Sequence, residues 1–154
     1  LIRLSPDSAL LTLSQLVELN LISQRLDLAM TEWLVREQGL DTAAIAGMSD
    51  AAYADAYRAC GHLEDRRRQI ELVDAVGRDL ERYVNNRSLR MGLKMMHQPA
   101  RMAGLGELYR FITDGVHAFR AMGGVSELLE TIRERETRIM ERVLAGEALP
   151  RRLD

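Results

Sequence analysis

A carboxylate and an imidazole stand three residues apart at Asp114 and His117. On a helix, this spacing places both groups on one face, and Glu107 lies two turns earlier at a similar azimuth. Helical bundles that bind two iron ions carry such a pair twice, together with further inward carboxylates. The sequence holds no second Glu-x-x-His or Asp-x-x-His. We therefore predict no metal site and no cofactor.

Nucleophilic chemistry has one candidate, Cys60, which lies two residues before His62 near a predicted helix end. A reactive cysteine needs a base and a group that orients the base, and no such set is evident in the sequence. Phosphate-loop, GxSxG and zinc-ligand spacings do not occur either. We predict no catalytic residue, and the sequence favours a protein that is not an enzyme.

The run "LRMGLKMMHQPARMAGLGELYRF", residues 89–111, combines methionine, glycine, proline and basic residues. One interpretation is a pocket between helices for a small molecule or a lipid. Its wall would be Met91, Met95, Met102 and Tyr109, with Arg101 or His97 holding a polar head group. The other interpretation is that methionines fill an irregular helix junction, and we favour it because methionine is a common gap filler in cores.

Basic residues in the same region form a possible phosphate-binding face. Arg87, Arg90 and Lys94 follow one another at i, i+3 and i+7, and Arg101 lies further along the chain. No aromatic residue is interleaved among them for base stacking. A solvated helix face is therefore the favoured interpretation, and nucleic acid is an unlikely partner.

The elements that must position these residues are all helices. Apolar residues recur every third or fourth position, and alternation typical of strands is nearly absent. Pro99 predicts a helix break, so we expect a corner of proline and glycine near residues 96–106. We predict one all-α domain over residues 1–154, a bundle of about five to six helices, at residues 6–38 with Ser5 as N-cap, 49–59, 63–84, 86–96, 99–122 and 126–144.

The first of these helices is apolar on more than one side. Its main stripe is predicted to contain Leu13, Leu16, Val17, Leu19, Leu26, Ala29, Met30 and Trp33. A second group of leucines falls off that stripe, at Leu10, Leu11, Leu21, Leu28 and Leu34. This arrangement predicts burial of the helix on two fronts, one of them against a partner.

Composition sets outer limits on function. The 154 residues are 47% hydrophobic and 29% charged, as in folded globular domains, and the formal net charge is −2. No overall field therefore recruits polyanions or acidic membranes. No apolar run is long enough to suggest a membrane span. The single cysteine fits a reducing compartment, so we expect a cytoplasmic location.

Residues 57–136 resemble the C-terminal half of uncharacterised bacterial FFLEELY-motif proteins. The resemblance lies in "RQI" with "VG", in "SLRMGLKMM…PARMAGLGEL", and in "FRAMGG" followed by "ETIRERE". The namesake motif is missing, so the resemblance implies a chain that lacks its N-terminal segment. His117 and His97 depart from the family pattern, which has an acidic and a small residue there. The resemblance implies no activity, substrate or cofactor.

Three functions remain open from the sequence. The leading hypothesis is a non-catalytic helical scaffold or protein-interaction domain, able to bind a second copy of itself. The alternative is a small-molecule or lipid-binding protein, or an enzyme, with its pocket at residues 91–109. The third is nucleic-acid binding through Arg87, Arg90, Lys94 and Arg101.

Overall fold

The computed structural model describes residues 6–147, and these residues form eight helices and no strand. The all-α prediction is therefore confirmed. Two short elements exceed the predicted five or six helices, since a four-residue helix follows the first helix and the predicted fifth helix is divided in two. The helices are α1 (Pro6–Gln38), α2 (Thr42–Ile45), α3 (Asp50–Cys60), α4 (Leu63–Asn85), α5 (Arg87–Met95), α6 (His97–Met102), α7 (Gly106–Ala121) and α8 (Ser126–Leu144).

Side-chain caps account for several helix starts. The Ser49 hydroxyl accepts a hydrogen bond from the Ala52 N–H (3.2 Å) at the start of α3, and the Asn86 side chain does the same for Leu89 in α5 (3.0 Å). Asp41 caps the short α2 in this way. The predicted cap at Ser5 lies outside the described residues.

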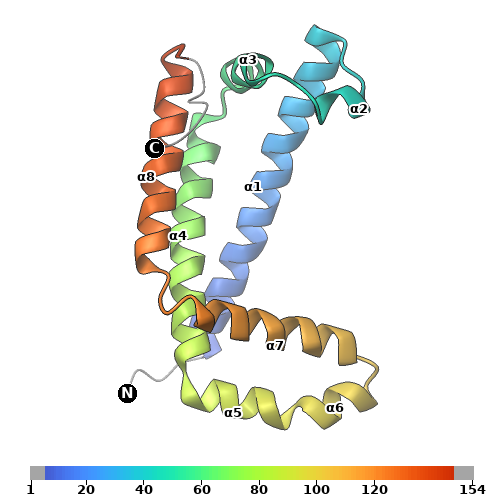
Figure 1. Ribbon diagram of the computed structural model, residues 1–154, viewed down its shortest axis with the longest axis vertical. Coiled ribbons are helices and arrows are strands. Elements are labelled where there is room, and N and C mark those ends of the chain that lie inside the picture. Colours follow the sequence, from blue (N-terminus) through green and yellow to red (C-terminus); the bar gives the residue numbers. More distant parts are fainter. Residues whose placement is uncertain (1–5, 148–154) are drawn as a thin grey trace.

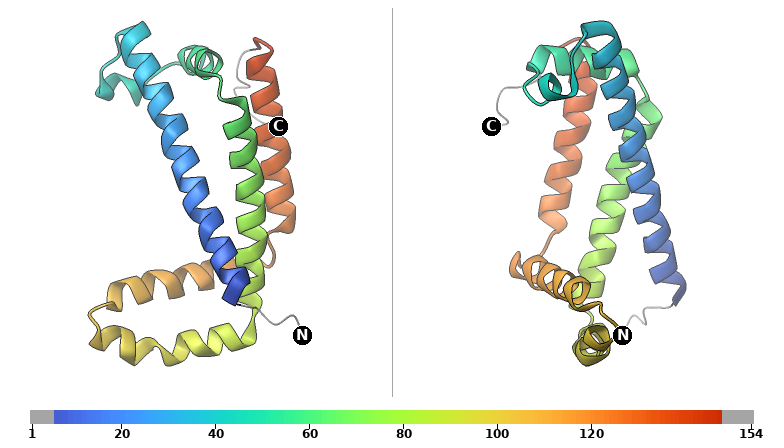
Figure 2. Two further views of the ribbon diagram at one scale, coloured as in Figure 1. Left: turned by 180° about the vertical axis from the view of Figure 1, so that it is seen from behind. Right: turned by 90° about the vertical axis from the view of Figure 1, so that its right-hand side faces the viewer.

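Three long helices, α1, α4 and α8, form a rod, and α3 crosses one end of it (Figures 1 and 2). Within α1 the buried apolar side chains are Ile22, Leu26, Met30 and Leu34, which follow each other at i, i+4. They pack on Leu72 of α4 and on a cluster from α3 and α8 that includes Tyr57 and Val143. The core of the protein therefore lies in the rod.

Two close approaches hold the rod helices in register. A Cβ added at Gly77 in α4 would lie only 2.6 Å from Leu129 Cδ2 in α8, so the glycine permits this contact. Between α1 and α4, the buried Asp79 carboxylate accepts a hydrogen bond from the Thr12 hydroxyl, and the Tyr83 hydroxyl donates to the Ser8 carbonyl (2.9 Å). The Asp79 carboxylate and the Tyr83 hydroxyl are thus satisfied across the α1–α4 contact.

Helices α5, α6 and α7 form an arm that projects to one side of the rod's lower end (Figures 1 and 2). The helix is interrupted at Met96, Pro99 lies in the first turns of α6, and the chain reverses over residues 103–105, where Gly104 has φ +74°. Helix α7 then returns beside α5 and α6 and packs on α4. Within residues 87–121, all of them described, Ala100 alone is buried.

The second apolar side of α1 is exposed. Leu13, Leu16 and Val17 were predicted in the core stripe but are exposed, whereas Leu34, which was predicted off the stripe, is 1% exposed. The stripe was assigned to the wrong face near the N-terminal half because both sides of α1 are leucine-rich. None of the helices in the described residues has the length and apolar character needed to cross a membrane.

Candidate functional site: a basic groove on the arm

The sequence's metal and nucleophile candidates do not come together. Asp114 and His117 are both exposed on α7, and residues 6–147 contain no group of three or more His, Cys, Asp or Glu able to hold a metal ion. The Cys60 thiol donates to the Ala29 carbonyl (3.3 Å), and burial raises its pKa. A thiol with a raised pKa supplies little thiolate at neutral pH.

A hollow of about 560 Å³ lies instead between α5 and α7. Arg87, Arg90 and Lys94 contribute its α5 wall together with Met91 and Leu93, and α7 contributes Tyr109, Thr113, Val116, His117 and Arg120. A second hollow of about 410 Å³ shares Tyr109 and Thr113 with the first and extends along α6 to His97, Arg101 and Arg110. We call the two adjoining hollows the basic groove.

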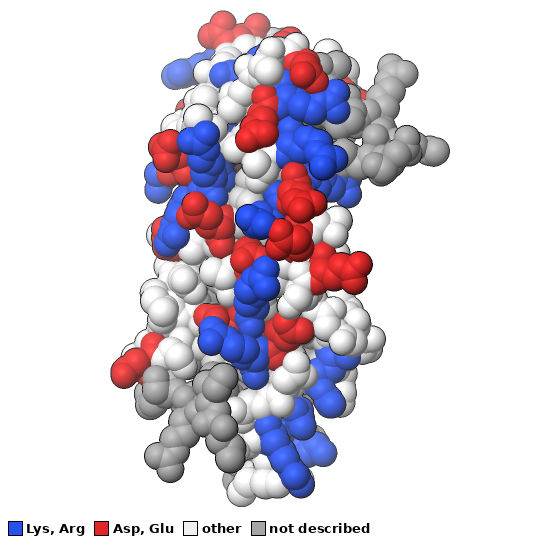
Figure 3. Space-filling view, turned by 90° about the vertical axis from the view of Figure 1, so that its left-hand side faces the viewer, with Lys and Arg blue, Asp and Glu red and all other residues white. Residues whose placement is uncertain are grey.

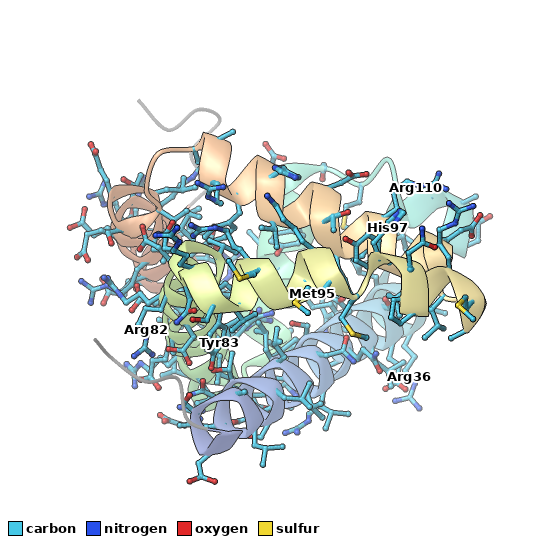
Figure 4. All side chains as sticks on the ribbon, turned by 90° about the horizontal axis from the view of Figure 1, so that it is seen from below. Arg36, Arg82, Tyr83, Met95, His97 and Arg110 are labelled. Atoms are coloured by element: carbon cyan, nitrogen blue, oxygen red, sulfur yellow. The ribbon has the colours of Figure 1, made fainter. Side chains whose placement is uncertain are left out.

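Helix periodicity explains why these residues line one groove. On α5, Arg87, Arg90, Met91 and Lys94 share a face, and on α7 the spacing 109, 113, 116, 117 and 120 repeats that pattern. Figure 4 views the arm from below, with His97 and Arg110 lying between α6 and α7 and Met95 on the side of α5 away from α7. The antiparallel pairing of α5–α6 with α7 brings the two faces together.

Hydrogen bonds and a ring contact fix the middle of the groove. The Tyr109 hydroxyl donates to the Leu93 carbonyl (3.1 Å), and its ring meets the His97 ring edge-on with centroids 5.4 Å apart. The Thr113 hydroxyl donates to the Tyr109 carbonyl (3.0 Å). At one end, Arg90 donates to the Asn85 carbonyl (2.7 Å), which ties it to the end of α4.

The groove gathers the arm's positive charge. Residues 86–122 contain six Lys and Arg against two Asp and Glu, a formal charge of +4, whereas the whole chain carries −2. Figure 3 shows the contrast, because Lys and Arg intermix with Asp and Glu along the rod and stand almost alone at the lower end. All six basic residues line the groove, at Arg87, Arg90, Lys94, Arg101, Arg110 and Arg120.

The structure brings together most of the residues that the sequence proposed for binding. Met91 and Tyr109 line the larger hollow, while His97 and Arg101 line the smaller one. Met95 and Met102 line neither; they are 74% and 88% exposed. Met91 and Met96 are exposed as well, so the prediction that these methionines fill a core is wrong.

Apart from Tyr109, the groove residues on α7 were not predicted as binding residues, although their helical spacing is visible in the sequence. From the sequence, His117 was considered only as a metal-ligand candidate with Asp114, and Thr113, His117 and Arg120 were not treated as part of a binding face. Only the pairing of α7 with α5 places these three residues opposite Arg87, Arg90 and Lys94.

A family model described as Domain of unknown function (DUF8198) matches residues 1–150. The chain belongs to this family. Comparison of the DUF8198 chain with curated proteins and with solved structures gives no match. The family description names no activity, so the function of the DUF8198 chain has to be argued from its own residues.

Proposed function

We propose that this DUF8198 protein is a non-catalytic interaction domain that pairs with a second copy of itself through the exposed face of α1. The observation that carries the proposal is a second apolar stripe on α1, opposite the buried one. It consists of Leu10, Val17, Leu21, Leu28 and Val35, all exposed. A solvated helix of a monomer does not ordinarily carry two apolar faces.

The spacing of this stripe suits helix pairing. Positions 10, 17, 21, 28 and 35 fall on the a and d positions of one heptad frame, which is the seam that helices present to each other in coiled coils. Ser14, Gln24 and Thr31 fill the remaining seam positions, and polar residues there favour one register over others. Because an identical stripe on a second copy matches it in length and spacing, self-pairing is the simplest occupant.

The exposed area of the chain supports an occupant of this size. The chain exposes 10990 Å², whereas a compact monomer of 17.4 kDa exposes about 7,900 Å² by the scaling of folded proteins. Even if residues 1–5 and 148–154 were fully solvated, an excess of about 1,600 Å² would remain. Obligate homodimers bury about 1,000–2,500 Å² per subunit, so the excess is enough for one such interface.

The arm enlarges the apolar surface on offer. Leu105, which precedes α7, and Leu108, Phe111 and Ile112 of α7 are exposed and line neither hollow of the basic groove. We propose that residues 96–106 act as the corner that folds α7 back and presents this surface beside α1. We also retain two sequence-based proposals, a cytoplasmic location, supported by the single free Cys60, and a relationship to FFLEELY-motif proteins.

The test compares two leucines of similar exposure on different helices. Leu28→Lys alters the proposed seam, and Leu128→Lys on α8 is the matched control, with exposures of 58% and 47%. Burying a leucine contributes about 1.5–3 kcal/mol, and a dimer loses it twice, so Leu28→Lys should weaken self-association by at least about 100-fold.

Sedimentation velocity across a dilution series measures the outcome, with far-ultraviolet circular dichroism as the check on folding. We expect a dimer for wild type and for Leu128→Lys and a monomer for Leu28→Lys. A wild-type chain that stays at 17.4 kDa at every concentration would reject self-association. Equal weakening by both substitutions would place the interface elsewhere.

A further inference from the structure

We propose that the basic groove on the arm binds a small ligand that carries several phosphate groups. This proposal is independent of self-association, because it concerns the face between α5–α6 and α7 and not the seam of α1. It starts from the composition of the groove. All six Lys and Arg of the arm line it together with His97 and His117, while among the described lining residues there is no carboxylate.

The two acids of the arm do not neutralise these cations. Glu107 and Asp114 line neither hollow, and within residues 6–147 none of Arg87, Lys94 and Arg120 forms an ion pair. The rod differs, because arginines such as Arg68 and Arg78 are paired with carboxylates there. Cations held close together without counter-charges repel one another, and a bound anion relieves that repulsion.

The donors suit phosphate. Arginine presents its N–H groups as a planar fork that matches phosphate oxygens, and five of the six cations of the groove are arginines. Arg87 and Lys94 are seven residues apart on α5, which is about 10 Å along the helix axis. One phosphate cannot span that distance, so the groove fits a ligand with several phosphates in a row.

Size and lining favour a small ligand over a nucleic-acid strand. The hollows of about 560 and 410 Å³ each fall within the usual range of small-molecule sites. Proteins that hold single strands stack successive bases on several aromatic rings. This groove has one aromatic residue, Tyr109, whose ring edge and hydroxyl already contact His97 and Leu93. Met91 and Val116 add apolar wall for the uncharged part of a ligand.

The experiment is calorimetric titration of the full chain with inorganic tripolyphosphate and, separately, with a nucleoside triphosphate. Arg87→Ala/Arg120→Ala removes one cation from each wall and leaves Arg90, which ties down the end of α4, in place. Arg135→Ala/Arg138→Ala on α8 removes the same charge from exposed positions outside the groove. Lys94→Gln is a second, single-site groove variant should the double variant lose helicity.

We expect both probes to bind, with affinity that falls as salt rises. The double groove variant should bind at least about tenfold more weakly, because two charge-assisted contacts are lost, and Lys94→Gln should weaken binding measurably. The α8 variant should match wild type. If the nucleoside triphosphate binds more tightly than tripolyphosphate, the apolar wall contacts the base. If the two probes bind with equal affinity, the groove recognises the polyphosphate alone.

Three results would overturn the proposal. Neither probe binding would exclude the ligand class. If the groove and α8 variants weakened probe binding equally, the net charge of the chain and not the groove would account for the binding. A single-stranded RNA that binds far more tightly than both probes would reassign the groove to nucleic acid. Sedimentation of Arg87→Ala/Arg120→Ala should still match wild type, so failure here is distinguishable from failure of the dimer proposal.

Discussion

Alanine at position 77 tests how closely α4 and α8 pack. The Cβ of this alanine would lie 2.6 and 2.8 Å from the two methyl carbons of Leu129 and 3.2 Å from its Cγ. Leu129 is buried, so its side chain cannot swing into solvent, and α8 has to shift or Leu129 has to leave its preferred rotamer. Gly77→Ala should therefore give no net stabilisation of the rod, although alanine favours helices more than glycine does.

The size of the effect follows from two opposing terms. Replacing glycine by alanine inside a helix contributes about 1 kcal/mol of stability. Overpacking a core contact costs about 1–3 kcal/mol. We expect Gly77→Ala to be neutral or destabilising by up to about 2 kcal/mol. In a Leu129→Ala background the clash is gone, and Gly77→Ala should stabilise by up to about 1 kcal/mol. The two sites should thus couple by about 1–3 kcal/mol.

Urea denaturation of the four members of this double-mutant cycle measures the coupling. All samples need one chain concentration, because association shifts apparent stability. Gly115→Ala on α7 is the control, since its added Cβ meets nothing within 4 Å and should not destabilise. If Gly77→Ala stabilised the wild-type and Leu129→Ala chains equally, α4 and α8 would not approach each other at this point, and the packing argument would be refuted.

Two further predictions concern the electrostatics of the rod. The Glu81 carboxylate accepts hydrogen bonds from the N–H of Val125 (3.1 Å) and the hydroxyl of Ser126 (3.3 Å) at the start of α8. Glu81→Ala should therefore lower the free energy of unfolding, measured in urea, by about 1 kcal/mol, and Glu81→Gln should lower it less. Equal stability of the wild type and both variants would contradict this cap. The hydrogen bond from Arg78 holds the pKa of Asp74 below its ordinary value. The ionised Asp74 therefore stabilises the fold above about pH 3.9, and this stabilisation is lost as the pH falls through the folded pKa. Asp74→Asn should make the free energy of unfolding depend less on pH in the acid range, and identical pH profiles for wild type and variant would contradict the prediction.

Helix positions were largely predictable because their signals are local. Proline, serine and asparagine at helix starts and glycine after helix ends act within one turn, so the predicted bounds of α1, α3 and α5 agree with the structure to within about a residue. The division of α6 from α7 was missed because Gly104 and Gly106 interrupt an otherwise helical apolar pattern. Glycine in a helical pattern does not by itself decide between tolerance and a break.

Which face of a helix is buried was less predictable, because burial depends on distant elements. Residues Leu13, Leu16 and Val17 have the same apolar character as Ile22, Leu26 and Met30, but only the second group meets α4 or the α3–α8 cluster. An amphipathic pattern names the core face only when the opposite face is polar. On α1 it is not, and this ambiguity is the sequence feature behind the proposed second interface.

The net charge of a sequence, like the apolar pattern of one helix, does not show which distant residues the fold brings together. A formal charge of −2 argues against recruitment of polyanions by the protein as a whole, but it averages an arm of +4 with a remainder of −6. Electrostatic attraction acts over about 10 Å at moderate salt, which is shorter than the rod, so a bound anion senses the arm and little of the rod. The quantity that governs anion binding is therefore the charge gathered between α5–α6 and α7. Arg87 and Lys94 come to line one hollow with Arg120 only because the chain reverses at Gly104.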